Sequence, residues 1–312
     1  MSFSVNFLTS SSSGWIASLG AAIAWSFSVT IYRTWGVGRS PRWLILFKGL
    51  IALGLFGVTS LLTRSDEALS NSAVVTLAWS GVIGILVGDW AFFSALMRLG
   101  GTLTSTIQCL APPMTAILAW LFLGESLEMR QVAGLTVTSA CLAVLVFFEA
   151  RKSGRVNQAG TKAVSGSRRI FFGGVALAVI AAMSQATGAV VAKPALNGLS
   201  PFVAASLRLW FPVSILFVWE MVNQGGILKA VRGITSGGGI AMLAVAGFTG
   251  TFLGLTMMMY GMAHAPLGVA LALNSTYPVW ILLWEWVSGK SSLGVRGSLL
   301  VLGSVSGIWL MI

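Results

Sequence analysis

The chain has 312 residues, of which 56% are hydrophobic and only 9% are charged, and its formal net charge is +11. Soluble domains contain about 25% charged residues, so this composition and a mean hydropathy of +0.89 exclude an ordinary soluble protein and indicate a bilayer protein. The basic residues lie in short loops between apolar segments, which argues against nucleic-acid binding. One histidine and two cysteines within apolar segments form no metal-site pattern, so we expect no metal and no cofactor.

Apolar segments follow one another along the chain, each near the ~20 residues that a helix needs to cross the hydrocarbon core. Backbone polar groups cannot stay unpaired in lipid, so these segments are expected to be helices. The ten segments are 15–33, 42–62, 73–97, 103–123, 131–149, 170–192, 202–222, 239–262, 267–288 and 295–312. The sequence therefore predicts an all-α integral membrane protein with ten transmembrane helices.

A basic linker at 151–169 divides the chain into two units, 1–150 and 170–312, each with five segments. The second unit repeats the first. The motif at 38–41 recurs at 198–201, and Lys48 recurs as Arg208 with the same offset of 160.

A later part of the repeat aligns with an offset of 166, which pairs 108–112 with 274–278. An odd number of segments per unit places the second unit in the membrane upside down relative to the first. Inverted repeats are typical of secondary transporters, whose binding site lies near the midplane between the halves.

Several features resemble the EamA-type branch of the drug/metabolite transporter (DMT) superfamily. They are the two five-helix halves, a basic residue early in the second and seventh helices, a proline in the fourth and ninth helices, and the sequence Leu-Phe-Leu-Gly-Glu at 121–125. The resemblance implies a transporter rather than an enzyme, one that exports or carries amino acids, other small metabolites or drugs. It also implies that both termini face the cytoplasm.

Paired amides and prolines give the first candidate for the central cavity. Gln108 precedes Pro112 by four residues, and Asn274 precedes Pro278 by four residues. A proline removes a backbone donor and frees the carbonyl one turn back, so these helices are weakened and can act as hinges or line a site. The alternative is a packing kink whose amides only join helices.

Other polar and aromatic residues inside the segments complete the predicted substrate site. Trp25 aligns with Gln185 in the repeat, while Trp90, Trp210 and Tyr277 are deep enough to wall a cavity. Arg208 either binds a carboxylate or phosphate of the substrate, or bonds helix-end carbonyls and extends to the interface.

Charged residues within the segments suggest ion pairing or proton coupling. Lys48 and Asp89 lie at similar depth on consecutive helices, so we expect them to pair, although Lys48 could instead extend to the interface. Asp89 and Glu285 are candidates for proton coupling, because carboxylates buried in lipid titrate near neutral pH. The residue that aligns with Asp89 near Arg208 is Leu255, so Arg208 lacks the matching acid.

These features predict a secondary transporter that exports an amino acid or a related metabolite by alternating access. The alternatives are a carrier of drugs or quaternary cations and a membrane scaffold or receptor without transport activity. We expect it in the bacterial inner (plasma) membrane, in contact with lipid and a small-molecule substrate, as a monomer or homodimer. Nearly all loop Lys and Arg residues lie in loops 1–2, 3–4, 5–6, 7–8 and 9–10, which places these loops in the cytoplasm, against the family precedent.

Overall fold

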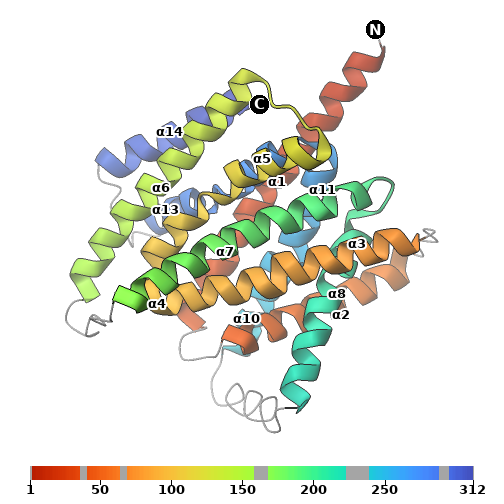
Figure 1. Ribbon diagram of the computed structural model, residues 1–312, viewed down its shortest axis with the longest axis horizontal. Coiled ribbons are helices and arrows are strands. Elements are labelled where there is room, and N and C mark those ends of the chain that lie inside the picture. Colours follow the sequence, from red (N-terminus) through yellow and green to blue (C-terminus); the bar gives the residue numbers. More distant parts are fainter. Residues whose placement is uncertain are drawn as a thin grey trace.

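The structure is a computed structural model that describes residues 2–35, 41–63, 69–157, 168–222, 239–287 and 295–311 (Figure 1). All secondary-structure elements among these residues are helical. The first half contains α1 (Ser2–Trp35), α2 (Pro41–Thr63), α3 (Asn71–Gly81), η1 (Val82–Val87), α4 (Gly88–Gln108), α5 (Ala111–Leu123) and α6 (Met129–Asn157). The second half contains α7 (Arg168–Ala192), η2 (Lys193–Leu196), α8 (Pro201–Val222), α10 (Ile240–Ala246), η3 (Gly247–Leu253), α11 (Gly254–His264), α12 (Leu267–Asn274), α13 (Tyr277–Val287) and α14 (Val295–Met311).

Helices long and apolar enough to cross a membrane occur in both halves. The described residues contain six such helices and four shorter apolar helices, and each of these overlaps one predicted segment. The prediction of an all-helical membrane protein is therefore confirmed.

The fourth and ninth predicted segments are broken rather than continuous. A turn at 109–110 separates α4 from α5, and a turn at 275–276 separates α12 from α13. Pro112 and Pro278 follow these turns and lack the N–H that would continue the preceding helix. Hydropathy alone did not predict either break, because a turn of two residues, Cys-Leu at 109–110 or Ser-Thr at 275–276, is too short to interrupt an apolar segment. Helix α4 also continues through 98–102, a predicted loop, where Leu99 packs closely against Gly174 of α7.

Both halves contain a π-helix at the same position of the repeat. Element η1 joins α3 to α4, and η3 joins α10 to α11. A glycine follows each π-helix and donates its N–H to a carbonyl five residues back: Gly88 to Ile83 and Gly254 to Thr249. Such wide turns are rare and often occur at functional sites.

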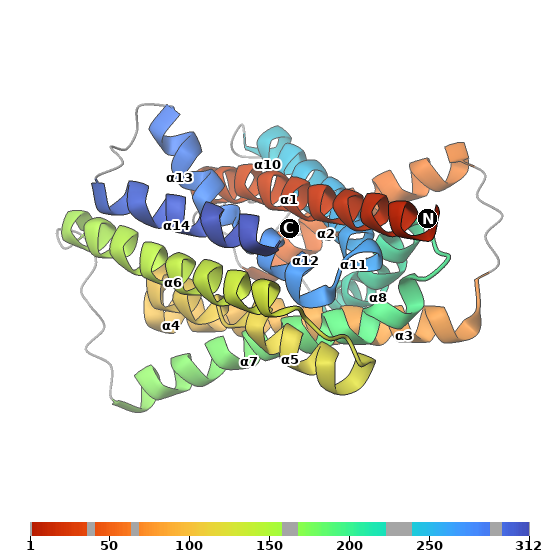
Figure 2. The same cartoon turned by 90° about the horizontal axis from the view of Figure 1, so that it is seen from above.

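Helices of the two halves pack against each other in pairs. Helix α1 of the first half packs on η3 and α11 of the second, and α7 of the second half packs on η1 and α4 of the first. Helices α2 and α8, α5 and α12, and α6 and α14 form the other pairs, and α6 and α14 lie side by side in Figure 2. The pairs α2–α8, α5–α12 and α6–α14 thus join helices at equivalent positions of the two halves. In contrast, α1 and α7 each pack on the π-helix of the other half and on the helix that follows it.

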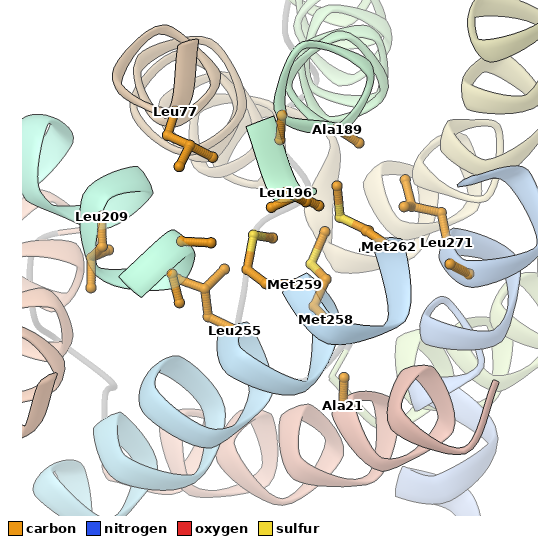
Figure 3. Packing of buried hydrophobic residues seen from close by; sticks show 14 of the residues in the cluster. Ala21, Leu77, Ala189, Leu196, Leu209, Leu255, Met258, Met259, Met262 and Leu271 are labelled. Atoms are coloured by element: carbon orange, nitrogen blue, oxygen red, sulfur yellow. The ribbon is translucent and has the colours of Figure 1, made fainter. Parts of the chain in front are cut away.

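The main core surrounds α11, where helices of both halves come together (Figure 3). Met258, Met259 and Met262 of α11 are buried there against Leu77 of α3 and Leu209 of α8. Methionine side chains are flexible and fill irregular gaps between helices. The core therefore joins the two halves rather than filling either one separately.

Candidate functional site

A cavity lies beside the two helix breaks. Its lining comes from α1, α7 and the residues around both breaks: Trp25, Gln108, Cys109, Gln185, Asn274, Ser275, Tyr277 and Pro278. The structure thus brings together the predicted amides, Trp25, Tyr277 and one predicted proline, from positions as far apart in the sequence as α1 and α13.

Each helix break positions one amide at the cavity. Gln108 is the last residue of α4 and Asn274 is the last residue of α12, so both side chains project where the helix stops. Gln108 Nε2 donates a hydrogen bond to Oε1 of Gln185, at 2.6 Å. Gln108 Oε1 and Asn274 Oδ1 are buried without a hydrogen-bond partner in the described part of the protein. Two residues that line the cavity therefore each have a buried amide oxygen without a hydrogen-bond partner among the described residues.

Trp25 is held in place by the glycines of the second π-helix. Its Nε1 donates to the Gly250 carbonyl at 2.6 Å. A Cβ added to Gly254 would lie 2.6 Å from Trp25 Cδ1, so the indole occupies space that only a glycine leaves open. At the equivalent place in the first half, a Cβ on Gly88 would meet its nearest atom, in Ser184, at 3.6 Å. Both halves thus have a glycine at this position, but only Gly254 of the second half lies against a tryptophan, Trp25 of α1.

Trp90 and Trp210 do not contribute to the cavity, which corrects their predicted role. Their side chains are 56% and 53% exposed, on the outer surface of α4 and α8. Depth along a span was the only basis for that prediction, and depth does not specify which face of the helix a residue occupies. Both indoles lie where lipid would surround the bundle.

Lys48 of α2 and Asp89 of α4 form a salt bridge within the bundle. Lys48 Nζ lies 3.3 Å from Asp89 Oδ2, and both side chains are partly buried. The predicted pairing of these two residues is therefore present in the geometry. Neither residue lines the cavity, so their role in coupling stays a prediction.

Arg208 also lies away from the cavity, against the prediction of substrate contact. The residue is only 2% exposed, and its Nη1 lies 3.9 Å from the sulfur atoms of Met259 and Met262. A Cβ on Gly84 would lie 2.9 Å from Arg208 Nη2, so this glycine makes room for the guanidinium. Its burial among methionines rules out the alternative in which it extends to the interface.

Arg208 lies against helices of the first half, in which Asp89 pairs with Lys48. The sequence placed Lys48 and Arg208 near opposite faces of the membrane, with no acid for Arg208 because Leu255 occupies the matching position. Leu255 is indeed buried in the apolar core. The packing of α8 on α3 and η1 places Arg208 beside Gly81 and Gly84 of the first half.

The remaining predicted residues have different surroundings. Pro112 is buried in the first turn of α5, and Pro278 occupies the first turn of α13 at the cavity. Glu285 belongs to α13, but its side chain lies outside the described residues. Within the described residues, no group of three or more His, Cys, Asp or Glu side chains is arranged to hold a metal ion.

A second polar cluster joins the halves at the end of α5 and was not predicted. Lys193 Nζ lies 3.3 Å from Glu125 Oε1 and donates to the carbonyls of Met262 and Ala265. Glu125 Oε2 accepts the N–H of Leu267, the first residue of α12, at 2.7 Å. The only sequence signal was Glu125 itself, a carboxylate directly after a helix-ending glycine with φ of 68°.

Comparisons with known proteins agree with this architecture. The family model described as the EamA-like transporter family matches twice, at residues 12–149 and 172–312. One solved crystal structure of a protein, 17% identical in sequence, superimposes with a TM-score of 0.74 and covers 96% of this chain and 97% of its own. At this identity the likeness shows the fold alone. No curated protein matches the sequence significantly.

Proposed function

Because the chain belongs to the EamA-like transporter family, whose members are membrane transporters of small solutes, we propose that it is a secondary carrier working by alternating access around the cavity. The proposed solute is an amino acid or a related small metabolite, and the proposed direction is export. The observation that carries this proposal is the position of the cavity, between helices of both halves and beside two helix breaks.

Two inverted repeats of five helices each are the architecture we propose. The family match covers each half separately, which supports the duplication. The two π-helices, the two helix breaks and the equivalent helix pairs between the halves also support it. A pseudo-two-fold axis in the membrane plane would relate all three pairs of features.

Alternating access requires points where one half can move relative to the other. The breaks before Pro112 and Pro278 are the hinges that we propose, because the backbone there already lacks continuous helical hydrogen bonds. Asp89 and Glu285 remain our candidates for proton coupling. A monomer and a homodimer are both compatible with a cavity formed within one chain.

For the membrane orientation, we propose that the loops rich in Lys and Arg face the cytoplasm of a bacterial cell. A reporter that is active only in the cytoplasm, fused after the C-terminus, tests this. We expect a weak signal, and a strong one would reverse the orientation without affecting the proposed transport.

Transport by the purified full chain in liposomes tests the function. Liposomes loaded with a mixture of labelled amino acids and small amines should lose at least one of these solutes faster than liposomes without the protein. Asn274→Leu should slow this efflux about tenfold or more, since it removes a cavity oxygen. Gln131→Leu is the matched control: Gln131 is buried, but it contacts the Glu128 backbone away from the cavity. Efflux no faster than from protein-free liposomes, for every solute, would refute the proposal.

A further inference from the structure

The unsatisfied groups around the cavity have a common chemistry. Among the described residues that line it, the buried side-chain atoms without a hydrogen-bond partner are Gln108 Oε1 and Asn274 Oδ1. Both are carbonyl oxygens, which can only accept hydrogen bonds. A buried acceptor left unpaired is destabilising, so a ligand that donates to both oxygens is favoured.

The backbone around the breaks also offers acceptors rather than donors. Pro112 and Pro113 supply no N–H in the first turn of α5, and Pro278 supplies none in the first turn of α13. The prolines at 112 and 278 consequently leave the carbonyls of Gln108 and Asn274 without their usual helical donors. Helix starts usually attract anions through their free N–H groups, and here the prolines remove part of that attraction.

Charged side chains give no reason to expect an anionic group either. None of the described residues lining the cavity is a Lys, Arg, Asp or Glu. Lys48 is paired with Asp89, and Arg208 is buried against methionines. A carboxylate or phosphate entering the cavity would therefore meet acceptor oxygens and no cation.

Aromatic rings complete the lining. Trp25 and Tyr277 both line the cavity, and the indole of Trp25 is fixed by its hydrogen bond to Gly250. The face of an aromatic ring attracts a cation through the ring's quadrupole. Acceptor oxygens together with aromatic rings favour a cation that also carries N–H donors.

We propose that the cavity selects its solute by a protonated amine that donates to Gln108 Oε1 and Asn274 Oδ1 beside Trp25 and Tyr277. This inference rests on the proposed transport function and narrows its substrate class to amines with at least two N–H groups. A quaternary ammonium has the charge but no N–H, so it leaves both oxygens unpaired. A carboxylate has neither the charge nor the donors.

Three probes of similar size test this selectivity: 2-phenylethylamine, its N,N,N-trimethyl derivative and 3-phenylpropionate. Each is titrated by calorimetry into the detergent-purified full chain at pH 7. We expect the primary amine to bind at least tenfold more tightly than either of the other two, because only it satisfies both oxygens. Gln108→Leu and Asn274→Leu should each weaken amine binding by about tenfold, whereas Gln131→Leu should leave it unchanged.

The unmodified protein alone can overturn the inference, so misfolding of a variant does not affect the test. Equal or tighter binding of the trimethyl compound or of the carboxylate would overturn it, and so would the absence of binding by all three. Transport in liposomes of carboxylates that lack an amine, or of quaternary cations, would overturn the amine selectivity while leaving the proposed function intact. Selective amine binding without any transport would overturn the proposed function while leaving the amine selectivity of the cavity intact.

Discussion

Gly254→Ala should displace Trp25 from the cavity, and the structure gives the size of the effect. The added Cβ would lie 2.6 Å from both Cδ1 and Nε1 of the indole, well inside van der Waals contact. Such overpacking costs about 1–3 kcal/mol, and losing the hydrogen bond from Trp25 to Gly250 costs about 1 kcal/mol more. Alanine regains about 0.5–1 kcal/mol as a better helix former than glycine. The expected net loss of unfolding free energy is about 1–3 kcal/mol.

Gly88→Ala is the matched control, because Gly88 follows the equivalent π-helix of the first half. Its added Cβ would have its nearest contact at 3.6 Å, which is ordinary packing, so only the helix-forming gain should remain. Unfolding in mixed dodecyl maltoside and SDS micelles, followed by circular dichroism, measures both variants. Equal changes in the unfolding free energy of the two variants would refute the reasoning, because the contact of the added Cβ with Trp25 would then have no effect on stability. Gly254→Ala should also weaken binding of 2-phenylethylamine, which Gly88→Ala should leave intact.

Two polar contacts between helices give the other predictions. Asp89→Asn leaves the Lys48 cation within the bundle without its carboxylate, so we expect it to lower the unfolding free energy by about 2–3 kcal/mol in the same micelle assay. The double variant Lys48→Met with Asp89→Leu should recover most of this loss, because it removes both charges. If the double variant is no more stable than Asp89→Asn, the salt bridge is not the cause. Lys193→Met removes the donor that links Glu125 to two carbonyls of the second half, at an expected cost of about 1–3 kcal/mol. The control is Arg130→Met, which breaks the exposed pair of Arg130 with Glu128 and should cost under about 1 kcal/mol. A similar loss in Lys193→Met and Arg130→Met would argue against a structural role for Lys193.

Several residues that the sequence proposed for the site line one cavity, and the repeat is the reason they could be selected. Gln108 and Asn274 occupy matching positions in the two halves, and both line the cavity. Trp25 and Gln185 were found by the same alignment. Trp90 and Trp210 were chosen from depth alone, and their helices turn them outward. The sequence predicted that Arg208 lies inside a helix, and it does. Its neighbours come from α3, η1 and α11, and these contacts cannot be read from the sequence of α8.

The sequence by itself determined the class of the protein, the positions of its apolar helices and the duplication, because hydropathy and repeated motifs are local properties of the chain. Tertiary structure decided which face of each helix points inward, and so which polar residues meet. The two helix breaks, the space that Gly254 leaves for Trp25, and the contact of Lys193 with Glu125 all depend on packing between segments that are far apart in the sequence. The unpaired oxygens of Gln108 and Asn274 have the same origin: an amide is identified by its sequence, but its unsatisfied state arises only from the groups packed around it.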